Sequence, residues 1–193
     1  GYDQTTPYIR TMWKRALRRI PRKSGVKRVL VLGLGAGGVI QDIRRRFPQC
    51  HLTIVEWDPV MIDIAEKLGL FARDDRTIII VDDAARAVST LRTASFDLII
   101  IDLFRGSEPA PVLATSAFVS ALARLLHVRG FLLLNVFKKQ ELFSLFDQAV
   151  SRHASWRYRY NRLALYRPWG NGCVGDPLPA GYQHYKQSRE YLR

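Results

Sequence analysis

A glycine-rich turn and the carboxylate that follows it are the residues of this 193-residue chain best suited to hold a ligand. The apolar run at residues 29–32 passes into a turn that contains Gly33, Gly35, Gly37 and Gly38. Glycines let the backbone turn tightly and approach a ligand, and a helix that follows offers free N–H groups. Glu56 ends the next apolar run, where a carboxylate can accept hydrogen bonds from both ribose hydroxyls. The pattern indicates a nucleoside ligand; the alternative is a structural tight turn.

Acidic residues also follow the next two apolar runs. Asp82 and Asp83 come after residues 77–81, and Asp102 ends the run FDLIIID. Because ligands of open parallel sheets bind outside the carboxyl ends of the strands, we expect these carboxylates to converge with Glu56. Asp83 or Ala84 would then reach an adenine edge. Asp102 would accept a hydrogen bond from a cationic amine or position a reacting group.

Alternating strand and helix patterns must position these residues. The apolar runs predict strands at residues 28–33, 51–56, 77–81, 96–102 and 131–136, and helical spacing predicts helices at 37–47, 59–68, 84–91, 112–126 and 139–153. Asp58 and Pro59 are suited to begin the second of these helices. Two aromatic runs, 156–160 and 163–166, predict an antiparallel pair. The alternation predicts an α/β fold, a Rossmann-like three-layer sandwich with helices on both faces of the sheet.

The first 26 residues form a separate unit in this interpretation. Residues 8–20 predict an amphipathic helix, in which Trp13 faces the main sheet and basic residues fill the other side, namely Arg10, Lys14, Arg15, Arg18 and Arg19. We expect this basic helix, within residues 1–26, to pack on a main domain at residues 27–168. Residues 169–193 are predicted to be a loop with a short helix.

The formal net charge of +13 and the pI near 10.3 favour an anionic partner. Nucleic acid bound through the N-terminal helix is one such partner; the alternative is a solvated basic face. The aromatic and basic residues at 156–160 could stack on bases, although an edge strand packed on one face is the simpler interpretation. The acceptor is expected to be a small molecule or a polyanion, and a homodimer is left open.

Neither a membrane partner nor a metal is predicted. No apolar run approaches the ~20 residues of a membrane span. The two cysteines, Cys50 and Cys173, and the four histidines lack metal-ligand spacing. Free thiols are typical of a reducing compartment, which predicts a cytoplasmic protein.

Several of these stretches together resemble one family. VLVLGLGAGG, VEWDP, the pair Asp83-Ala84 and FDLIIID are similar to the class I S-adenosylmethionine-dependent methyltransferase fold, and more narrowly to its spermidine synthase (polyamine synthase) branch. The resemblance covers about residues 27–137. It implies a mostly parallel seven-stranded sheet whose last strand is antiparallel. It also implies S-adenosylmethionine, its decarboxylated form or methylthioadenosine as the ligand, held by Gly33, Leu34, Gly35, Ala36, Gly37, Glu56, Trp57, Asp82, Asp83, Ala84 and Asp102.

Two positions depart from the spermidine synthase pattern. That branch usually reads GGGDGG at the turn, where the acid lies near the amino end of the decarboxylated cofactor; here the position is Ala36. The branch also carries a D-S-x-D segment after strand four, where this chain has Asp102 and then Arg105 in place of the second acid. A guanidinium stays protonated and cannot act as a general base. The candidate catalytic residues are therefore Asp102 and Arg105.

These departures favour methyl transfer over polyamine synthesis. Methyl transfer from a sulfonium can proceed mainly by positioning, so it tolerates the loss of a base. In this hypothesis Arg105 and Glu108 line the acceptor mouth, unless the two simply form an ion pair. The alternatives are an aminopropyltransferase in which Asp102 or Glu108 serves the amine, a catalytically silent cofactor- or polyanion-binding module, and a nicotinamide-dependent oxidoreductase.

Overall fold

The structure is a computed structural model that describes residues 7–35 and 37–169, and its centre is a seven-stranded sheet. The strand order is β3-β2-β1-β4-β7-β9-β8. In chain order the strands are β1 (Arg28–Leu32), β2 (His51–Glu56), β3 (Thr77–Val81), β4 (Phe96–Ile101), β7 (Leu126–Phe137), β8 (Ser151–Tyr158) and β9 (Asn161–Arg167). Only the last strand, β9, runs antiparallel to its two neighbours. The sheet predicted from the sequence is therefore confirmed.

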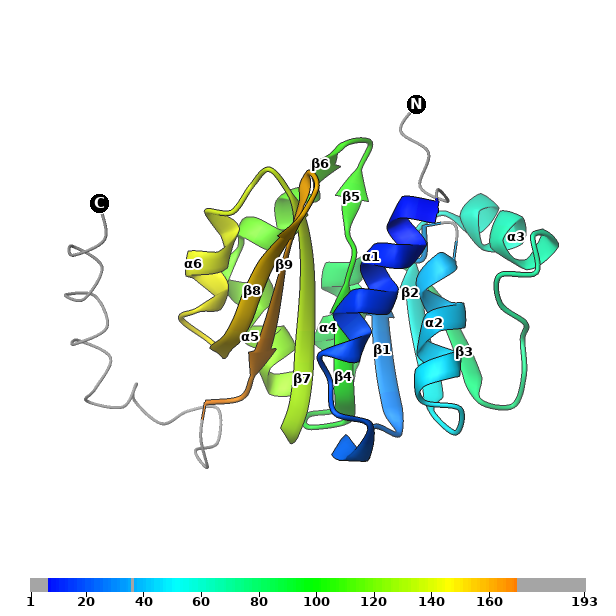
Figure 1. Cartoon of the computed structure of the whole chain (residues 1–193), viewed down its shortest axis with the longest axis horizontal. Coiled ribbons are helices and arrows are strands. Elements are labelled where there is room, and N and C mark those ends of the chain that lie inside the picture. Colours follow the sequence, from blue (N-terminus) through cyan, green and yellow to red (C-terminus); the bar gives the residue numbers. More distant parts are fainter. Residues whose placement is uncertain (1–6, 36, 170–193) are drawn as a thin grey trace.

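Helices cover both faces of this sheet and complete the predicted three layers (Figure 1). One core cluster holds residues of α1 (Pro7–Arg18), α2 (Gly38–Arg46) and α3 (Pro59–Lys67). The other cluster holds residues of α4 (Ala84–Thr90), α5 (Ser116–Leu125) and α6 (Leu142–Phe146). Adjacent residues of β1 alternate between the clusters, with Val29 and Val31 in the first and Leu30 and Leu32 in the second. A strand buried on both sides explains why its sequence is continuously apolar.

Helix α1 is built into the first core cluster. Its inner residues Met12, Trp13, Ala16 and Leu17 are almost fully buried, as is Ile20 just beyond its end. The guanidinium of Arg46 on α2 donates a hydrogen bond to the carbonyl of Ile20. The inner face of α1 is therefore part of the same core as the sheet. The boundaries predicted at residues 26 and 168 stay predictions, and the predicted tail, apart from Trp169, lies outside the described residues.

The helix predicted at residues 139–153 is wrong over most of its length. Helix α6 covers only Leu142–Phe146, and β8 begins at Ser151. Residues 151–158 alternate between less and more exposed positions, and they pair with β9 along its length. A period of two fits a strand, and the backbone hydrogen bonds of β9 decide between the two states. The turn of this pair lies at residues 159 and 160, so Asn161 and Arg162 belong to β9 instead of separating the strands.

The segment between β4 and β7 also differs from its prediction. The expected loop at residues 103–111 contains a small hairpin of β5 (Phe104–Arg105) and β6 (Glu108–Pro109). A 3₁₀ helix, η2 (Pro111–Ala114), replaces the first turn of the predicted helix, and Thr115 is extended. Thr115 separates η2 from α5, which therefore begins later than predicted, at Ser116. Strand β7 is longer than predicted and starts at Leu126.

Gly33 directly follows β1 and packs against the backbone of Asp102, which directly follows β4. Its φ of +85° lies in the left-handed region, and a Cβ atom there would lie 2.4 Å from the Asp102 carbonyl oxygen. Gly25 has a similar φ of +72°, but a Cβ there would meet nothing within 4 Å. Both glycines therefore have a left-handed backbone that disfavours other residues, but only at Gly33 would a side chain also clash with a neighbouring atom.

Replacing Gly33 by alanine should therefore destabilise the protein far more than replacing Gly25. We expect Gly25→Ala to lower the free energy of unfolding by roughly 1–2 kcal/mol, which is the usual cost of a left-handed alanine. Gly33→Ala should lower it by roughly 3 kcal/mol or more, since the backbone at Asp102 must also move. Urea denaturation of the three proteins measures both values. Equal losses for the two variants would contradict the close approach.

Candidate functional site

The ends of four neighbouring strands meet at one edge of the sheet. The backbone hydrogen bonds of the sheet continue for one residue past the strands. Gly33 N–H donates to the Val55 carbonyl at 2.9 Å, and Asp102 N–H donates to the Leu32 carbonyl at 2.9 Å. Asp82 N–H donates to the backbone carbonyl of Glu56 at 3.1 Å. The glycine turn therefore lies between the end of β2, which carries Glu56, and the end of β4, which precedes Asp102. This arrangement brings together the residues that the sequence singled out at the ends of β1, β2, β3 and β4.

The turn itself needs glycine at several positions. Gly33, Gly35 and Gly37 have φ values of +85°, +51° and +81°. Gly37 precedes α2 as its N-cap residue and donates its N–H to the carbonyl of Leu34 at 2.9 Å. A Cβ atom on Gly37 would also lie 3.1 Å from Leu70 Cβ. Ala36, the position at which the chain departs from the spermidine synthase pattern, lies outside the described residues.

Glu56 fixes the turn through its carboxylate. The residue is only 5% exposed, and its Oε2 accepts a hydrogen bond from Leu34 N–H at 2.8 Å. Its Oε1 accepts from Asp58 N–H at 3.1 Å. A carboxylate has about four lone-pair sites, so two bonds leave room for further donors such as ribose hydroxyls. Glu56 thus has a structural role that the sequence did not reveal, in addition to the predicted one.

Of the residues that follow β2 and β3, one is an exposed aromatic and two are helix caps. Trp57 is 68% exposed, so its indole is free to meet a ligand. Asp58 caps α3 by accepting from Val60 N–H at 2.9 Å, as predicted. Asp83 caps α4 by accepting from Ala85 and Arg86 N–H, and Ala84 is buried in the first turn of that helix. Contact of Asp83 or Ala84 with an adenine edge stays a prediction.

Asp82 is held by an ion pair with Arg86, one turn along α4. The hydrogen bond from Arg86 lowers the pKa of the Asp82 carboxyl, and the bond from the Asp83 N–H at 2.7 Å acts in the same direction. Asp82 therefore stays ionised at neutral pH, beside the backbone of Glu56.

Asp102 lies at the end of a chain of hydrogen bonds that starts on α1. The Tyr8 hydroxyl lies 2.7 Å from Asn161 Oδ1, Asn161 Nδ2 donates to Asn135 Oδ1 at 2.9 Å, and Asn135 Nδ2 donates to Asp102 Oδ1 at 2.8 Å. The Trp13 side chain also hydrogen-bonds Asp102. The Tyr8 hydroxyl has one proton for two nearby acceptors, so the ordered donors are the amides of Asn161 and Asn135, and the last of these reaches the carboxylate. We call the five residues Tyr8, Trp13, Asn135, Asn161 and Asp102 the Asp102 network.

Sequence reasoning missed most of this network. Asn135 is 2% exposed and interrupts the apolar run FLLLNVF, so a lone amide within a strand was the available signal. Buried amides are almost always hydrogen-bonded, which would have called for a nearby partner. Nothing in the sequence indicated that this partner would be Asp102, because β4 and β7 meet only in the fold.

Burial raises the pKa of the Asp102 carboxyl to about 6. Hydrogen bonds from Asn135 and Trp13 oppose this shift because they favour the charged form, and the nearby charge of Glu56 adds to it. Asp102 therefore changes its charge close to neutral pH, which suits a group that exchanges a proton.

Arg105 lies on the β5–β6 hairpin and is not part of the Asp102 network. It is exposed on the β5–β6 hairpin, where it is opposite Glu108 in register. Among the described residues, no ion pair joins Arg105 to Glu108; Glu108 Oε2 lies 4.0 Å from Lys139 Nζ instead. The alternative of a simple Arg105–Glu108 ion pair is thus not what the structure shows. A role for Arg105 at the acceptor mouth stays a prediction.

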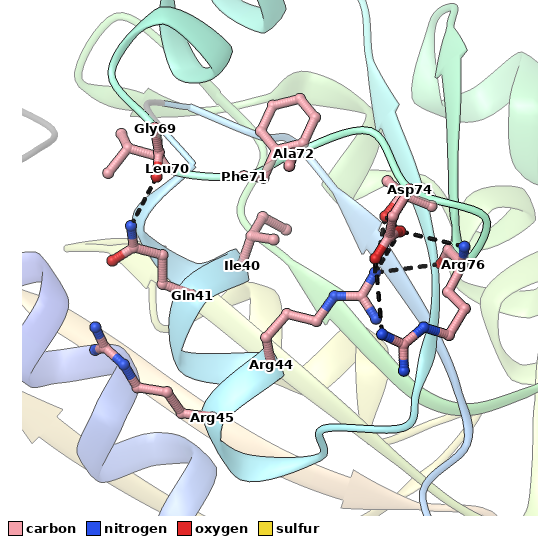
Figure 2. Close-up of a pocket in the computed structure, with 11 residues that line it drawn as sticks. Ile40, Gln41, Arg44, Arg45, Gly69, Leu70, Phe71, Ala72, Asp74 and Arg76 are labelled. Carbon is pink, nitrogen blue, oxygen red and sulfur yellow. Dashed lines mark hydrogen bonds and ion pairs between the residues drawn. The ribbon is translucent and has the colours of Figure 1, made fainter.

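A pocket lies elsewhere, between α2 and the segment that joins α3 to β3 (Figure 2). Its volume is about 460 Å³, and it is lined by Ile40, Gln41, Arg44, Arg45, residues 69–72, Asp74, Arg76 and Thr77. None of the predicted cofactor residues lines it. Figure 2 shows Arg44 and Arg76 directed toward Asp74 at one end of the pocket.

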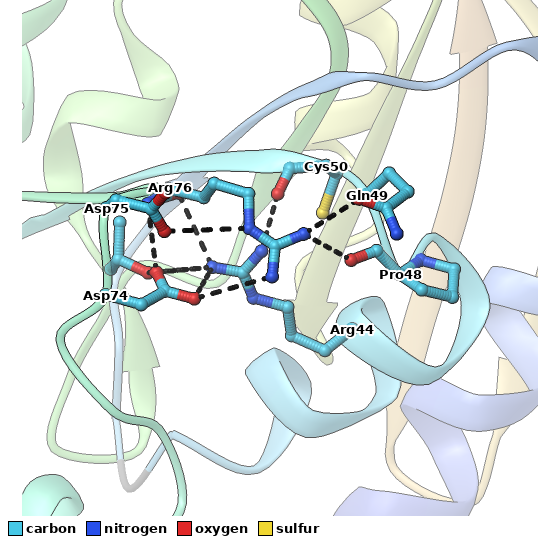
Figure 3. A network of polar contacts seen from close by, with 8 residues as sticks. Arg44, Pro48, Gln49, Cys50, Asp74, Asp75 and Arg76 are labelled. Atoms are coloured by element: carbon cyan, nitrogen blue, oxygen red, sulfur yellow. Dashed lines mark hydrogen bonds and ion pairs between the residues drawn. The ribbon is translucent and has the colours of Figure 1, made fainter.

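The arginines of this pocket are engaged in holding loops together (Figure 3). Arg44 Nη2 donates to Asp74 at 3.0 Å and to Thr77 at 2.8 Å, while its Nη1 donates to the Cys50 carbonyl at 2.5 Å. Arg76 donates to Pro48 and Gln49. These bonds tie the segment before β2 to the one before β3. These contacts of Arg44 and Arg76 therefore have a structural role.

Within residues 7–35 and 37–169, no three His, Cys, Asp or Glu side chains gather closely enough to hold a metal ion. In the same residues, no helix has the length and apolarity needed to cross a membrane.

The sequence of residues 11–161 matches the family described as the spermine/spermidine synthase domain. The chain belongs to this family. The chain is 32% identical to a polyamine aminopropyltransferase of Vibrio vulnificus over 119 residues, which are 61% of this chain and 40% of that protein. It is 35% identical to an eEF1A lysine and N-terminal methyltransferase homolog of Drosophila pseudoobscura over 85 residues, which are 43% of this chain and 13% of that protein. The chain thus spans less than half of either relative.

Solved structures of both kinds share the fold of this chain. Human methyltransferase-like protein 13 in complex with SAH aligns with a TM-score of 0.69 at 17% identity, covering 95% of this chain and 90% of that one. A probable spermidine synthase of Corynebacterium glutamicum aligns with a TM-score of 0.70 at 21% identity, covering 95% and 70%. A spermidine synthase with the transition-state analogue AdoDATO also aligns, with a TM-score of 0.68 at 19% identity, covering 89% and 65%. S-adenosylmethionine or its decarboxylated form, as predicted, is the cofactor of this family.

The raised pKa of Asp102 predicts a specific pH dependence of stability. The carboxyl ionises near pH 3.8 when unfolded and at about 6 when folded, so the stability it contributes is complete below pH 3.8 and is lost as the pH rises through 6. Relative to Asp102→Asn, the wild type should lose about 3 kcal/mol of unfolding free energy between pH 3.5 and 7. Urea denaturation of both proteins across this range gives the difference, in which other titrating groups cancel. A constant difference would show that Asp102 is not desolvated.

Proposed function

We propose that this chain binds S-adenosylmethionine and transfers its methyl group to an acceptor that is still to be identified. Family membership supports a transferase in general, since both methyltransferases and aminopropyltransferases are among the relatives. The choice of methyl transfer is our own and is based on the residues of this chain.

The residues at the strand ends fit a cofactor of this type. Gly33 lets the turn pack directly against the Asp102 backbone, where a Cβ would lie 2.4 Å from the carbonyl oxygen, so the glycine turn and Asp102 lie side by side at the strand ends. The Glu56 carboxylate is fixed by two backbone donors and retains free lone pairs for ribose hydroxyls. The exposed Trp57 ring follows directly and offers an apolar surface. When bound, the cofactor would supply the reactive methyl group.

Arg105 is the observation that carries the proposal of methyl transfer. It occupies the position at which polyamine synthases have an acid, and it lies exposed on the β5–β6 hairpin. A fixed positive charge cannot accept a proton from an amine and would repel a polyamine. The same charge would attract an acceptor that is anionic or bears a carbonyl group. Methyl transfer needs chiefly the correct alignment of donor and acceptor, so no further base is required.

Aminopropyl transfer is the second candidate, and Asp102 favours it. This carboxyl is retained, lies beside the glycine turn and has a pKa of about 6, so it could hold or deprotonate an attacking amine. A silent cofactor-binding module is the third candidate, and it would bind the cofactor without turnover.

Calorimetry with the two forms of the cofactor tests the proposal. We expect S-adenosylmethionine to bind at least about tenfold more tightly than the decarboxylated form, since Ala36 replaces the acid that would repel a carboxylate. Tighter binding of the decarboxylated form, together with spermidine formed from putrescine, would overturn it in favour of aminopropyl transfer.

Glu56→Gln should weaken cofactor binding by roughly tenfold to a hundredfold, because charge-assisted hydrogen bonds to ribose hydroxyls would be lost. Glu66→Gln on α3 is the matched control, since Glu66 is ion-paired with Arg73 and is not among the predicted cofactor residues. Calorimetry on both variants, with circular dichroism to check folding, makes the comparison. A folded Glu56→Gln protein with unchanged affinity would remove Glu56 from the site.

A further inference from the structure

The cations of α1 differ from arginines elsewhere in the protein. Away from α1, arginines are commonly ion-paired with carboxylates, as in the pairs Arg28–Asp97, Arg44–Asp74, Arg73–Glu66, Arg76–Asp74, Arg86–Asp82 and Arg152–Asp147. Within the part of the chain that the structure describes, no ion pair reaches the exposed cations of α1 and the turn after it, which are Arg10, Lys14, Arg15, Arg18, Arg19, Arg22 and Lys23. We call these seven residues the N-terminal basic surface.

Aromatic rings of β8 hold two of these guanidinium groups in place. Arg19 lies over the Trp156 ring at 4.2 Å from its centroid, and Arg15 lies over the Tyr158 ring at 5.3 Å. Stacking uses the flat face of a guanidinium and leaves its N–H edge free for a bidentate bond to an oxyanion. The two arginines are therefore oriented without being neutralised.

The neighbouring helix α2 adds to the positive potential. Burial lowers the pKa of Arg46, and the nearby charges of Arg22 and Arg18 lower it further, so these three cations repel one another. Residues 7–50 contain twelve Lys and Arg residues and a single acid, Asp42, which is 6% exposed. An anion bound here would relieve the repulsion among the cations.

We propose that the N-terminal basic surface binds the phosphate backbone of a nucleic acid, without reading its base sequence. Five of its seven residues are arginine, whose planar fork matches a phosphate in two hydrogen bonds. A lipid bilayer fits less well, because the apolar residues of α1 are buried in the core and cannot insert into a membrane. The proposal does not depend on the transferase activity, since it needs neither the cofactor nor the acceptor.

The salt dependence of binding tests this proposal. A fluorescently labelled 20-nucleotide single-stranded RNA is titrated with the full chain at several KCl concentrations, and anisotropy gives the dissociation constant. We expect the logarithm of the association constant to fall linearly with the logarithm of the salt concentration. In the double variant Arg15→Gln/Arg19→Gln the magnitude of this slope should fall by about 1.4, which is about 0.7 for each lost phosphate contact.

The double variant Arg73→Gln/Arg92→Gln removes the same charge from surface positions outside α1 and should leave the slope unchanged. Circular dichroism verifies that both double variants are folded. An equal loss of slope in the control, or no salt-dependent binding by the wild type, would overturn the proposal. So would binding of polyglutamate, or of vesicles containing phosphatidylglycerol, under conditions in which the RNA does not bind.

Discussion

The position of Asp102 is the constraint on which the rest of the structure depends. Its backbone carbonyl faces Gly33 so closely that no side chain fits between them, and its N–H bonds to the end of β1. Its carboxylate receives hydrogen bonds from Asn135 on β7 and from Trp13 on α1. One residue thus joins the glycine turn, the central strands and the N-terminal helix. A partly buried carboxyl needs such partners, because an unpaired one would be costly to desolvate.

The Asp102 network also makes α1 a part of the candidate site. Tyr8 and Trp13 lie on the inner side of the helix, one at the start of the network and the other on the carboxylate itself. Removal of α1 would expose the first core cluster and would withdraw Trp13, a donor that favours the ionised form of Asp102. The helix is therefore more than an appendage, even though the sequence sets it apart by its charge.

Much of the fold could be predicted because its signals are local. The apolar runs of β1 to β4, the Asp58 cap and the glycine turn each lie within a few residues, and each was found where the sequence placed it. The failures involve distant partners. Residues 151–153 were predicted as the end of a helix and belong to β8 instead, because β9 offers them hydrogen bonds. Asn135 and Asn161 come together only when β7 and β9 pair, so neither could be connected to Asp102 from spacing alone.

The same distinction explains why the cofactor class is easier to infer than the reaction. The predicted cofactor-binding residues are concentrated in short stretches within the part of the chain that matches the family: the glycine turn with Glu56 beyond it, and Asp102 at the end of β4. The acceptor side depends on a single exposed arginine of a two-residue strand, whose side chain makes no ion pair among the described residues. Because an arginine at this position is a permanent cation where the spermidine synthase pattern has a proton acceptor, a shared fold is compatible with a changed chemistry. The charge at position 105 is therefore the feature that most separates this chain from a polyamine synthase.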